Sequence, residues 1–259
     1  MRTASSPAEA STLLALLHTA ADAVATALAA SGERGLSGAR PGQYRADVVA
    51  DTAVLPVLAA AGVGTLSEES GLEPADLDDV DVVVVVDPLD GSTNADRGVP
   101  WFATSLCAVD GDGPVAAVVA DLARGIRFEA TRGGGARIRG DGPVAPSGCA
   151  RLADAVVGLS GWPPTHLGWN QYRTFGAAAL DLCAVAAGVL DGYVDCSVDA
   201  HGPWDYLGGA LVCREAGAMV SDALGRELIV LDHDARRTPV AAATPALHDA
   251  LVTARRSFR

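Results

Sequence analysis

The chain contains no lysine, so all 19 of its cationic side chains are arginines, set against 32 aspartates and glutamates. The absence of lysine excludes a lysine Schiff base and a P-loop lysine. A formal net charge of −13 is opposite in sign to that of a strongly basic nucleic-acid binder. If so acidic a protein takes an anionic substrate, it must reverse the charge locally, and a bound metal cation is the usual means.

The sequence also lacks paired cysteines. Its five cysteines are widely spread, odd in number and form no C-x-x-C pair, which argues against a disulfide framework or a structural zinc site. We expect them to act as small apolar residues in a reducing compartment, and we therefore expect a cytoplasmic protein. They are Cys107, Cys149, Cys183, Cys196 and Cys213.

Long apolar runs are missing too. The Ala-rich stretch at residues 13–30 is interrupted by His18 and Asp22, which predicts an amphipathic helix rather than a signal peptide or a membrane span. We expect no membrane partner. No Pro/Gly/Ser-rich linker divides the 259 residues, a length that suits one large domain or two modest ones.

Hydrophobic periodicity predicts helices packed on an antiparallel-rich sheet in the first part of the chain. Five consecutive valines at residues 82–86 are too few for a helix and too apolar for an edge strand, so they indicate a central buried strand. The predicted helices cover residues 7–31 and 45–61. The predicted strands cover residues 63–66, 82–86, 103–109, 115–121 and 126–131.

The remainder alternates strands and helices, which is typical of an α/β arrangement. The predicted strands cover residues 156–160, 193–196, 228–231 and 240–243, and the predicted helices cover residues 176–188, 204–216 and 247–256. We expect two tightly joined subdomains, residues 1–145 and 146–259, that form one compact unit.

The octapeptide Asp-Pro-Leu-Asp-Gly-Ser-Thr-Asn at residues 87–94 follows the valine run directly. Asp87 and Asp90 offer hard oxygen ligands of the kind that Mg²⁺ prefers. Gly91 and Ser92 look like the start of a helical turn, whose free backbone N–H groups bind anions. The alternative is an ordinary strand-to-helix turn in which Asp90 or Ser92 only caps a helix.

Other acids have ordinary explanations when each is taken alone. Glu68 fits a solvated acidic patch, and Asp205 fits the first turn of a helix. The combination is more informative, because Glu68, Asp87, Asp90 and Asp205 each lie where a regular element ends or begins. Such a set from distant segments indicates a multinuclear carboxylate site, where cations offset the repulsion between the acids.

These motifs resemble those of the inositol monophosphatase family of magnesium-dependent, lithium-sensitive phosphatases. Residues 87–94 match its D-P-[IVL]-D-G-[TS]-x-N signature, and residues 67–70 resemble its G-E-E-S element with Ser67 in place of Gly. Residues 204–217 resemble its W-D-x-A-[AG]-G…E-A-G element with Leu207 in place of Ala. The resemblance covers about residues 45–220 and implies an α+β fold, a layered α-β-α-β-α sandwich.

The resemblance also implies roles for individual residues. Glu68, Asp87 and the Leu89 carbonyl would bind one Mg²⁺, and Asp87, Asp90 and Asp205 a second. A third, weaker ion near Glu68 is a family feature, which gives two or three ions in all.

On the phosphate side, the N–H groups of Gly91 and Ser92 would hold the phosphate. The Ser92 hydroxyl, Glu68 and an aspartate on the second helix would form the catalytic group that orients the attacking water. The family places two helix acids six residues apart, whereas Asp47 and Asp51 are four apart. We favour Asp51 as the partner of Ser92, with Asp47 as the alternative.

The residues expected to contact the alcohol part of the substrate match the family's motifs less closely. Ala178 lies in a segment, residues 176–181, that would line this part of the site, and Asp195 would bind substrate hydroxyls. The gap between Asp195 and Asp205 is longer than usual, so Asp199 or His201 could take that place. Residues 161–173, which include Trp162 and Trp169, form a candidate specificity loop or an ordinary surface connection.

The implied reaction is hydrolysis of a phosphate monoester, in which a metal-activated water attacks phosphorus in line and a second metal stabilises the leaving alkoxide. Direct attack by Asp87 or Asp90 is the rival, which the resemblance disfavours because both serve as ligands. Inositol 1-phosphate is the first substrate candidate; histidinol phosphate, fructose 1,6-bisphosphate and 3′-phosphoadenosine 5′-phosphate are its rivals. A non-catalytic metal- or phosphate-binding regulator is the alternative from another class.

We expect the partner to be a small phosphorylated metabolite and not a nucleic-acid polymer. A homodimer is expected by family analogy alone.

Overall fold

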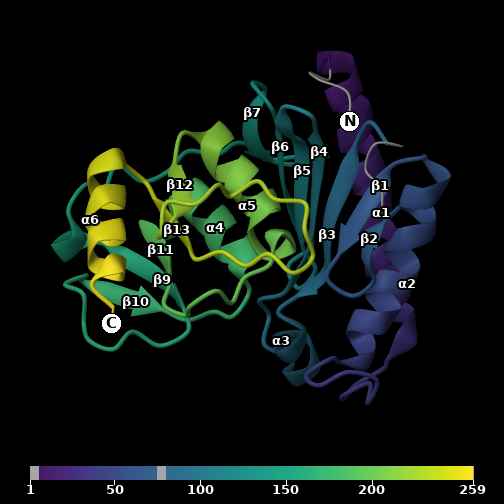
Figure 1. Ribbon diagram of the computed structural model, residues 1–259, viewed down its shortest axis with the longest axis horizontal. Helices are drawn as coiled ribbons and strands as arrows, with labels where there is room; N and C mark the ends of the chain where they lie inside the picture. The colour runs from purple at the N-terminus through teal and green to yellow at the C-terminus, as the bar shows by residue number, and fades with distance from the viewer. Residues whose placement is uncertain (1–5, 75–79, 259) are drawn as a thin grey trace.

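The computed structural model describes residues 6–74 and 80–258, which form five layers of alternating helices and sheets (Figure 1). Helices α1 (Pro7–Ser31) and α2 (Arg45–Ala60) cover the outer face of an eight-stranded sheet. Helices α4 (Ala178–Ala186) and α5 (Pro203–Ala216) lie between this sheet and a five-stranded one, and α6 (Pro245–Arg256) covers the far face of the second sheet. The predicted layered α+β fold is confirmed.

The outer helical layer consists of α1 (Pro7–Ser31) and α2 (Arg45–Ala60). Among the described residues, α1 alone has the length and apolar composition that a membrane span would need. Its inner face nevertheless packs within the protein, because Leu17 and Val24 are fully buried in a cluster with residues of α2 and the sheet. This one-sided packing is the amphipathic pattern expected from the sequence.

The eight-stranded sheet has the order β2-β1-β3-β4-β5-β6-β7-β8. Strands β1 and β3 are parallel and all the other neighbours are antiparallel, as predicted for this part of the chain. The strands are β1 (Gly64–Ser67), β2 (Gly71–Glu73), β3 (Val83–Asp90), β4 (Ala103–Asp110), β5 (Gly113–Asp121), β6 (Ile126–Thr131), β7 (Gly135–Ile138) and β8 (Gly142–Pro143).

Four of the five valines, residues 83–86, form the first half of the buried strand β3, and both faces of this strand are covered. Side chains alternate along a strand. Val84 and Val86 therefore pack with α1 and α2, while Val83 and Val85 pack in the cluster that contains α4 and α5. Burial on both faces explains why the run is continuously apolar.

The second sheet has the order β10-β9-β11-β13-β12. Its strands are β9 (Val156–Ser160), β10 (Gln171–Arg173), β11 (Gly192–Asp195), β12 (Met219–Asp222) and β13 (Pro239–Ala242). The remaining helices are α3 (Ser92–Arg97), α4 (Ala178–Ala186), α5 (Pro203–Ala216) and α6 (Pro245–Arg256), with a 3₁₀ turn at Leu152–Asp154.

One predicted strand is wrong. Residues 228–231 do not form a strand, and β12 pairs with β13 instead. The Leu228 carbonyl accepts a hydrogen bond from the Tyr206 hydroxyl at 2.8 Å, so a side chain from α5 takes the acceptor that a strand partner would use. Short strands β2, β7, β8, β10 and β12 were not predicted, because few residues in each carry a periodic signal.

The connection between Pro143 and Val156 joins the last strand of the first sheet to the first strand of the second. The helices α4 and α5 follow this connection in the chain but pack against strands of the first sheet. A single hydrophobic cluster therefore contains residues from both parts of the chain. The division at residue 145 stays a prediction.

Candidate metal centre

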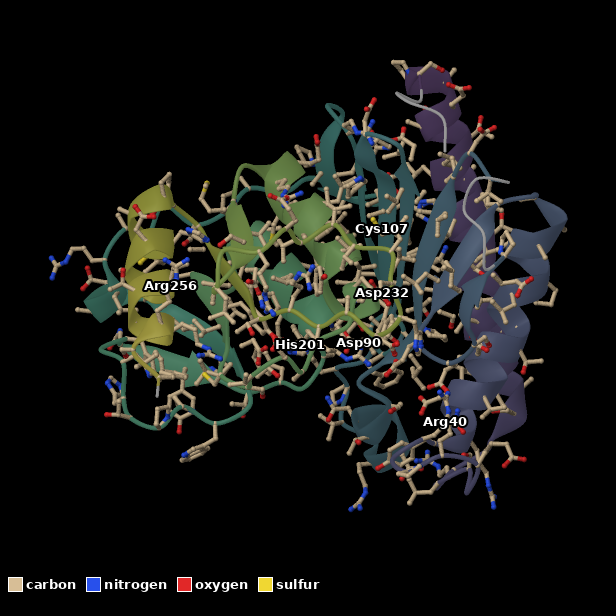
Figure 2. The ribbon with its side chains drawn as sticks, viewed as in Figure 1. Arg40, Asp90, Cys107, His201, Asp232 and Arg256 are labelled. Atoms are coloured by element: carbon tan, nitrogen blue, oxygen red, sulfur yellow. The ribbon has the colours of Figure 1, made fainter. Side chains whose placement is uncertain are left out.

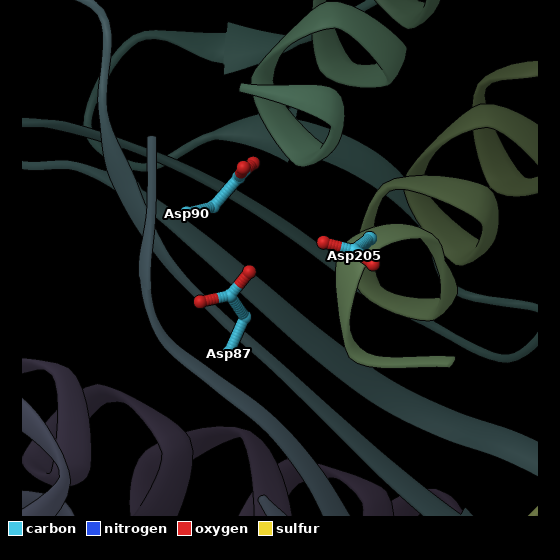
Figure 3. Close-up of side chains that lie close together, drawn as sticks. All are labelled: Asp87, Asp90 and Asp205. Carbon is cyan, nitrogen blue, oxygen red and sulfur yellow. The ribbon is translucent and has the colours of Figure 1, made fainter. Parts of the chain in front are cut away.

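Three aspartates converge where β3 ends and α5 begins. Asp87 and Asp90 are the last acids of β3, and Asp205 lies in the first turn of α5. One carboxylate oxygen from each lies within 4.8 Å of the others, and Figure 3 shows the three side chains facing a common space. The structure thus brings together three residues that are up to 118 positions apart in the sequence (205 − 87).

Backbone N–H groups hold each of these carboxylates. Asp87 Oδ1 accepts from the Leu89 N–H at 3.0 Å, and Asp90 Oδ2 accepts from the Ala179 N–H in the first turn of α4 at 2.8 Å. Asp205 Oδ2 accepts from the Gly202 N–H at 2.7 Å, which caps the start of α5. Each of the three carboxylates is therefore held in place by a hydrogen bond from a backbone N–H group of the protein itself.

Two of the acids are almost wholly buried, with 1% of Asp87 and 7% of Asp90 exposed. Burial raises the pKa of Asp87, and the nearby charges of Glu68 and Asp90 raise it further. Burial also raises the pKa of Asp90, followed by the charge of Asp205. Divalent cations favour such oxygen donors and offset their repulsion, so the residues present fit a hard metal ion such as Mg²⁺.

Glu68 joins the cluster because β1 runs parallel to β3. Ser67 pairs with Val86, and the Glu68 N–H donates to the Val86 carbonyl at 3.1 Å, so the carboxyl ends of both strands meet at one edge. Glu68 shares a hydrogen bond with Asp87. Burial, followed by the charges of Asp205 and Asp47, raises the pKa of Glu68 to about 8.

Gly91 turns the chain from β3 into α3. Its φ of +83° lies in the left-handed region, and a Cβ there would lie 3.0 Å from the Trp101 carbonyl oxygen and 3.2 Å from that of Gly176. Only glycine meets both conditions without strain. This turn places the Leu89 carbonyl and the Gly91 and Ser92 N–H groups next to the aspartates in the chain; their roles toward metal and phosphate stay predictions.

The partner of Ser92 is Asp47, and the prediction of Asp51 is wrong. Ser92 hydrogen-bonds to the carboxylate of Asp47, which is 6% exposed. Burial raises the pKa of Asp47, while hydrogen bonds from the Tyr44 N–H and Ser92 lower it in part.

Asp51 lies one turn further along α2 and serves a different element. It accepts hydrogen bonds from Ser67 Oγ at 2.6 Å and from the Ser70 hydroxyl, at the end of β1 and just after it. Asp51 therefore supports the segment that carries Glu68, and it does not contact Ser92.

The structure separates the three residues that are candidates for binding substrate hydroxyls, Asp195, Asp199 and His201. Asp195 ends β11 fully buried, and its Oδ1 lies 3.8 Å from His201 Nε2. His201 Nδ1 lies 3.5 Å from Asp205 Oδ2, so His201 connects these two acids. Asp199 instead forms an ion pair with Arg226 at 2.7 Å and is not part of this group.

His201 also lies close to Asp90, one of the three converging aspartates, at the junction of the two parts of the chain (Figure 2). Burial alone would lower the pKa of His201, but the hydrogen bond and charge of Asp205 and the charge of Asp195 raise it to about 9. Ala178 is the first residue of α4, next to the Ala179 N–H that holds Asp90.

Sequence reasoning missed the residues around the mouth of the site. A polar pocket of about 400 Å³ opens beside Asp47, Glu68 and Ser92. Its other walls come from the loop at residues 40–43 and from Trp204, His233 and Arg236.

His233 ties this pocket to the acids, because its Nε2 lies 3.1 Å from the Glu68 carbonyl oxygen and its ring 4.8 Å from that of Trp204. The contact joins residues 165 positions apart, and no local sequence signal could have found it.

Comparisons with known proteins agree with this geometry. The model of the inositol monophosphatase family matches residues 13–258, so the chain belongs to the inositol monophosphatase family. The family is metal-dependent and includes phosphatases.

Three relatives illustrate its range. Nus factor SuhB of Escherichia coli (strain K12) is 38% identical over 176 residues, covering 62% of this chain and 63% of that protein. The chain thus matches less than two thirds of that relative's length. Inositol-1-monophosphatase of Mesorhizobium japonicum is 36% identical over 206 residues, covering 71% of this chain and 74% of that protein. The crystal structure of extragenic suppressor protein suhB from Bartonella henselae superimposes with a TM-score of 0.80 at 28% identity, covering 96% of this chain and 100% of that one.

Proposed function

We propose that this protein is a Mg²⁺-dependent phosphate monoester hydrolase of the inositol-1-monophosphatase type. The observation that carries the proposal is the convergence of Asp87, Asp90 and Asp205 within 4.8 Å, with Glu68 hydrogen-bonded to Asp87. A site that served only to bind a cation would not need the Ser92–Asp47 pair beside it.

The proposed metal ligands come from the ends of β1 and β3 and from the first turn of α5. Glu68, Asp87 and the Leu89 carbonyl would hold one Mg²⁺, and Asp87, Asp90 and Asp205 another, with a third, weaker ion near Glu68. Bound magnesium supplies a nucleophilic water at neutral pH and stabilises negative charge on the leaving oxygen.

The chain's own groups orient the water. The Ser92 hydroxyl hydrogen-bonds to Asp47, and this pair lies beside Glu68 at the same pocket. In our proposal Ser92 accepts a hydrogen bond from the attacking water and passes its own proton toward Asp47. Burial raises the pKa of Asp47, and a raised pKa brings a general base closer to the operating pH.

The Gly91 and Ser92 N–H groups would donate to the phosphate oxygens opposite the leaving group. Such donors do not change position during the reaction, so they stabilise charge that develops on the phosphoryl group. Asp195, oriented by the Ser197 N–H at 2.8 Å, and Ala178 at the start of α4 would contact the alcohol part of the substrate.

The substrate class is a small phosphorylated metabolite, with inositol 1-phosphate first and histidinol phosphate, fructose 1,6-bisphosphate and 3′-phosphoadenosine 5′-phosphate as the rivals. The acidic surface supports a metabolite over a nucleic-acid polymer. A cytoplasmic location without membrane contact and a homodimer complete the proposal, the dimer by analogy alone.

A second candidate is a non-catalytic metal- or phosphate-binding regulator. The observation that favours it is the similarity to a protein named Nus factor SuhB. Against it stands the retention of the hydroxyl and carboxylate that catalysis needs, Ser92 and Asp47.

The test is phosphate release from the four substrates with Mg²⁺, with and without EDTA. We expect Mg²⁺-dependent release from at least one substrate, and inhibition of that release by Li⁺. Binding of Mg²⁺ with no release from any of the four would favour the regulator.

A chiral thiophosphate analogue of the active substrate then separates water attack from attack by Asp87 or Asp90. A single in-line displacement inverts the configuration at phosphorus, whereas a phosphoenzyme route retains it.

A further inference from the structure

The loop between β12 and β13, residues 223–238, leaves the second sheet and reaches the end of β1 in the first (Figure 1). Within the loop, Asp232 Oδ1 accepts a hydrogen bond from the Asp234 N–H at 2.9 Å, which forms a tight turn. The turn presents His233, whose Nε2 lies 3.1 Å from the Glu68 carbonyl oxygen. A carbonyl oxygen only accepts hydrogen bonds, so Nε2 carries the proton and donates it.

The backbone of Glu68 is thereby held at both of its polar groups. Glu68 follows the last residue of β1, and its N–H still donates to the Val86 carbonyl of β3 at 3.1 Å. The donor for its carbonyl comes from His233, in the other half of the chain. The side chain between these two groups shares a hydrogen bond with Asp87. His233 therefore helps to fix a carboxylate of the candidate metal centre without touching that carboxylate.

The same loop is attached to the start of α5, which carries Asp205. The Arg237 N–H donates to the His201 carbonyl at 2.8 Å, four residues before Asp205. The His233 ring lies 4.8 Å from the ring of Trp204, the residue directly before Asp205. These contacts fix the position of His233 relative to the first turn of the helix.

Trp204 is packed firmly enough to serve as this anchor. It is buried, and a Cβ at Gly202 would lie 2.4 Å from two atoms of its ring, so glycine allows the ring to fold back over the chain. The Arg236 guanidinium lies 5.1 Å from the centre of the same ring, and its Nη1 donates to the His233 carbonyl at 2.7 Å. A cation–π contact and a hydrogen bond thus hold the backbone of His233 beside Trp204.

We propose that His233 is a positioning residue for the metal centre, which fixes Glu68 relative to Asp205 and thereby raises the affinity for Mg²⁺. The inference rests on the proposed function, because it concerns Mg²⁺ binding by these two acids. They lie 137 positions apart in the sequence (205 − 68). Ligands that the protein already holds in place cost less to order when an ion binds.

The two acids need such a link because they repel each other. Burial, followed by the charge of Asp205, raises the pKa of Glu68 to about 8. Like charges at one site disfavour each other until a cation offsets them. A contact that holds both segments in place keeps the ligands together before the ion binds.

Isothermal titration calorimetry with MgCl₂ separates the hydrogen bond of His233 from the packing of its ring. His233→Phe keeps a ring beside Trp204 and removes the donor, whereas His233→Gln keeps an N–H donor and removes the ring. We expect His233→Phe to raise the Kd for Mg²⁺ about tenfold, at the lower end of the range for losing a group that orients a metal ligand. His233→Gln should recover most of the affinity, and His233→Ala should bind as weakly as His233→Phe.

His166→Ala is the matched control and should bind Mg²⁺ like the wild-type protein. His166 is an exposed histidine between β9 and β10, and its Nδ1 accepts from the Gly168 N–H of its own loop at 3.1 Å. The melting temperature of each metal-free protein shows whether a variant only weakens the fold. A lower melting temperature of His233→Phe with an unchanged Kd would overturn the proposal. So would a larger rise in Kd for His233→Gln than for His233→Phe, because the ring would then set the affinity.

Phosphate release by the same proteins distinguishes this inference from the proposed function. Mg²⁺ binding without release from any of the four substrates would refute the phosphatase function alone, and calorimetry would still test His233. Phosphate release by the wild-type protein together with equal Kd values for Mg²⁺ in the wild type and His233→Phe would refute the role of His233 alone. A wild-type protein that binds no Mg²⁺ would overturn both.

Discussion

The Ser92 hydroxyl and the Asp47 carboxylate hydrogen-bond across the space between α3 and α2. Asp47 is the third residue of α2, and its Oδ2 also accepts from the Tyr44 N–H at 2.7 Å, which caps that helix. The same carboxylate therefore fixes the start of α2 and holds the hydroxyl beside Glu68. In the proposed mechanism, this arrangement gives Asp47 the role of general base and Asp51 a supporting role.

Asp47→Asn should reduce kcat by about 10²–10⁴, the range for losing a positioned general base, with little change in KM. Asp51→Asn is the matched control, one helical turn away and equally buried. It should keep kcat within a few-fold but lower the melting temperature, because Asp51 accepts hydrogen bonds from both Ser67 and Ser70. Steady-state kinetics at saturating Mg²⁺ check both variants. Equal loss of kcat in the two would contradict the assignment.

Gly91→Ala should remove most activity and destabilise the fold. Its Cβ would meet the Trp101 carbonyl oxygen at 3.0 Å in addition to the strain of a positive φ. Gly98→Ala at the other end of α3 tests the backbone strain without a steric clash, because the φ of Gly98 is +74° and a Cβ there meets nothing within 4 Å. Gly98→Ala should lose about 1–2 kcal/mol of stability and remain active. Denaturant unfolding together with phosphate release measures both effects, and identical behaviour of the two variants would be evidence against the tight turn.

The metal-free protein should lose stability as the pH rises from about 5 to 9. Burial and neighbouring acids raise the pKa of Glu68 from 4.5 to about 8, so the folded protein holds a proton there that the unfolded chain releases. That contribution to stability is fully present below pH 4.5 and is lost as the pH rises through 8.

Mg²⁺ should reverse this trend, because a metal replaces the protons on its ligands. The rise in melting temperature caused by Mg²⁺ should be larger at pH 8.5 than at pH 6, and Glu68→Gln should reduce the difference. Thermal melts at several pH values measure it. A Mg²⁺ effect that is the same at both pH values in the wild-type protein would speak against a carboxylate metal site.

Much of the fold could be predicted because the core elements carry strong local signals. The valine run is apolar on both faces, and it became a strand buried on both faces. The octapeptide that follows it combines two acids with a glycine whose left-handed φ the turn requires. These features depend on residues that are adjacent in sequence, so periodicity and turn chemistry reveal them.

The other features of the fold and of the candidate site could not be predicted, because they depend on contacts between distant segments. Asp47 and Asp51 look alike in sequence, and only the packing of α3 against the first turn of α2 decides which one meets Ser92. The contact of His233 with the Glu68 carbonyl crosses from one sheet region to the other. In the same way, the Tyr206 hydroxyl holds the apolar residues near Leu228 out of the sheet.

Phosphate release by the wild-type protein and by Asp90→Asn across a Mg²⁺ titration tests the central claim most directly. The substitution removes one charge from the metal centre, yet the amide oxygen of asparagine can still accept from the Ala179 N–H that holds Asp90 at 2.8 Å. We predict release that depends on Mg²⁺ in the wild-type protein and background release at all Mg²⁺ concentrations in Asp90→Asn, with an unchanged circular dichroism spectrum. Near wild-type turnover of folded Asp90→Asn at saturating Mg²⁺ would contradict the account.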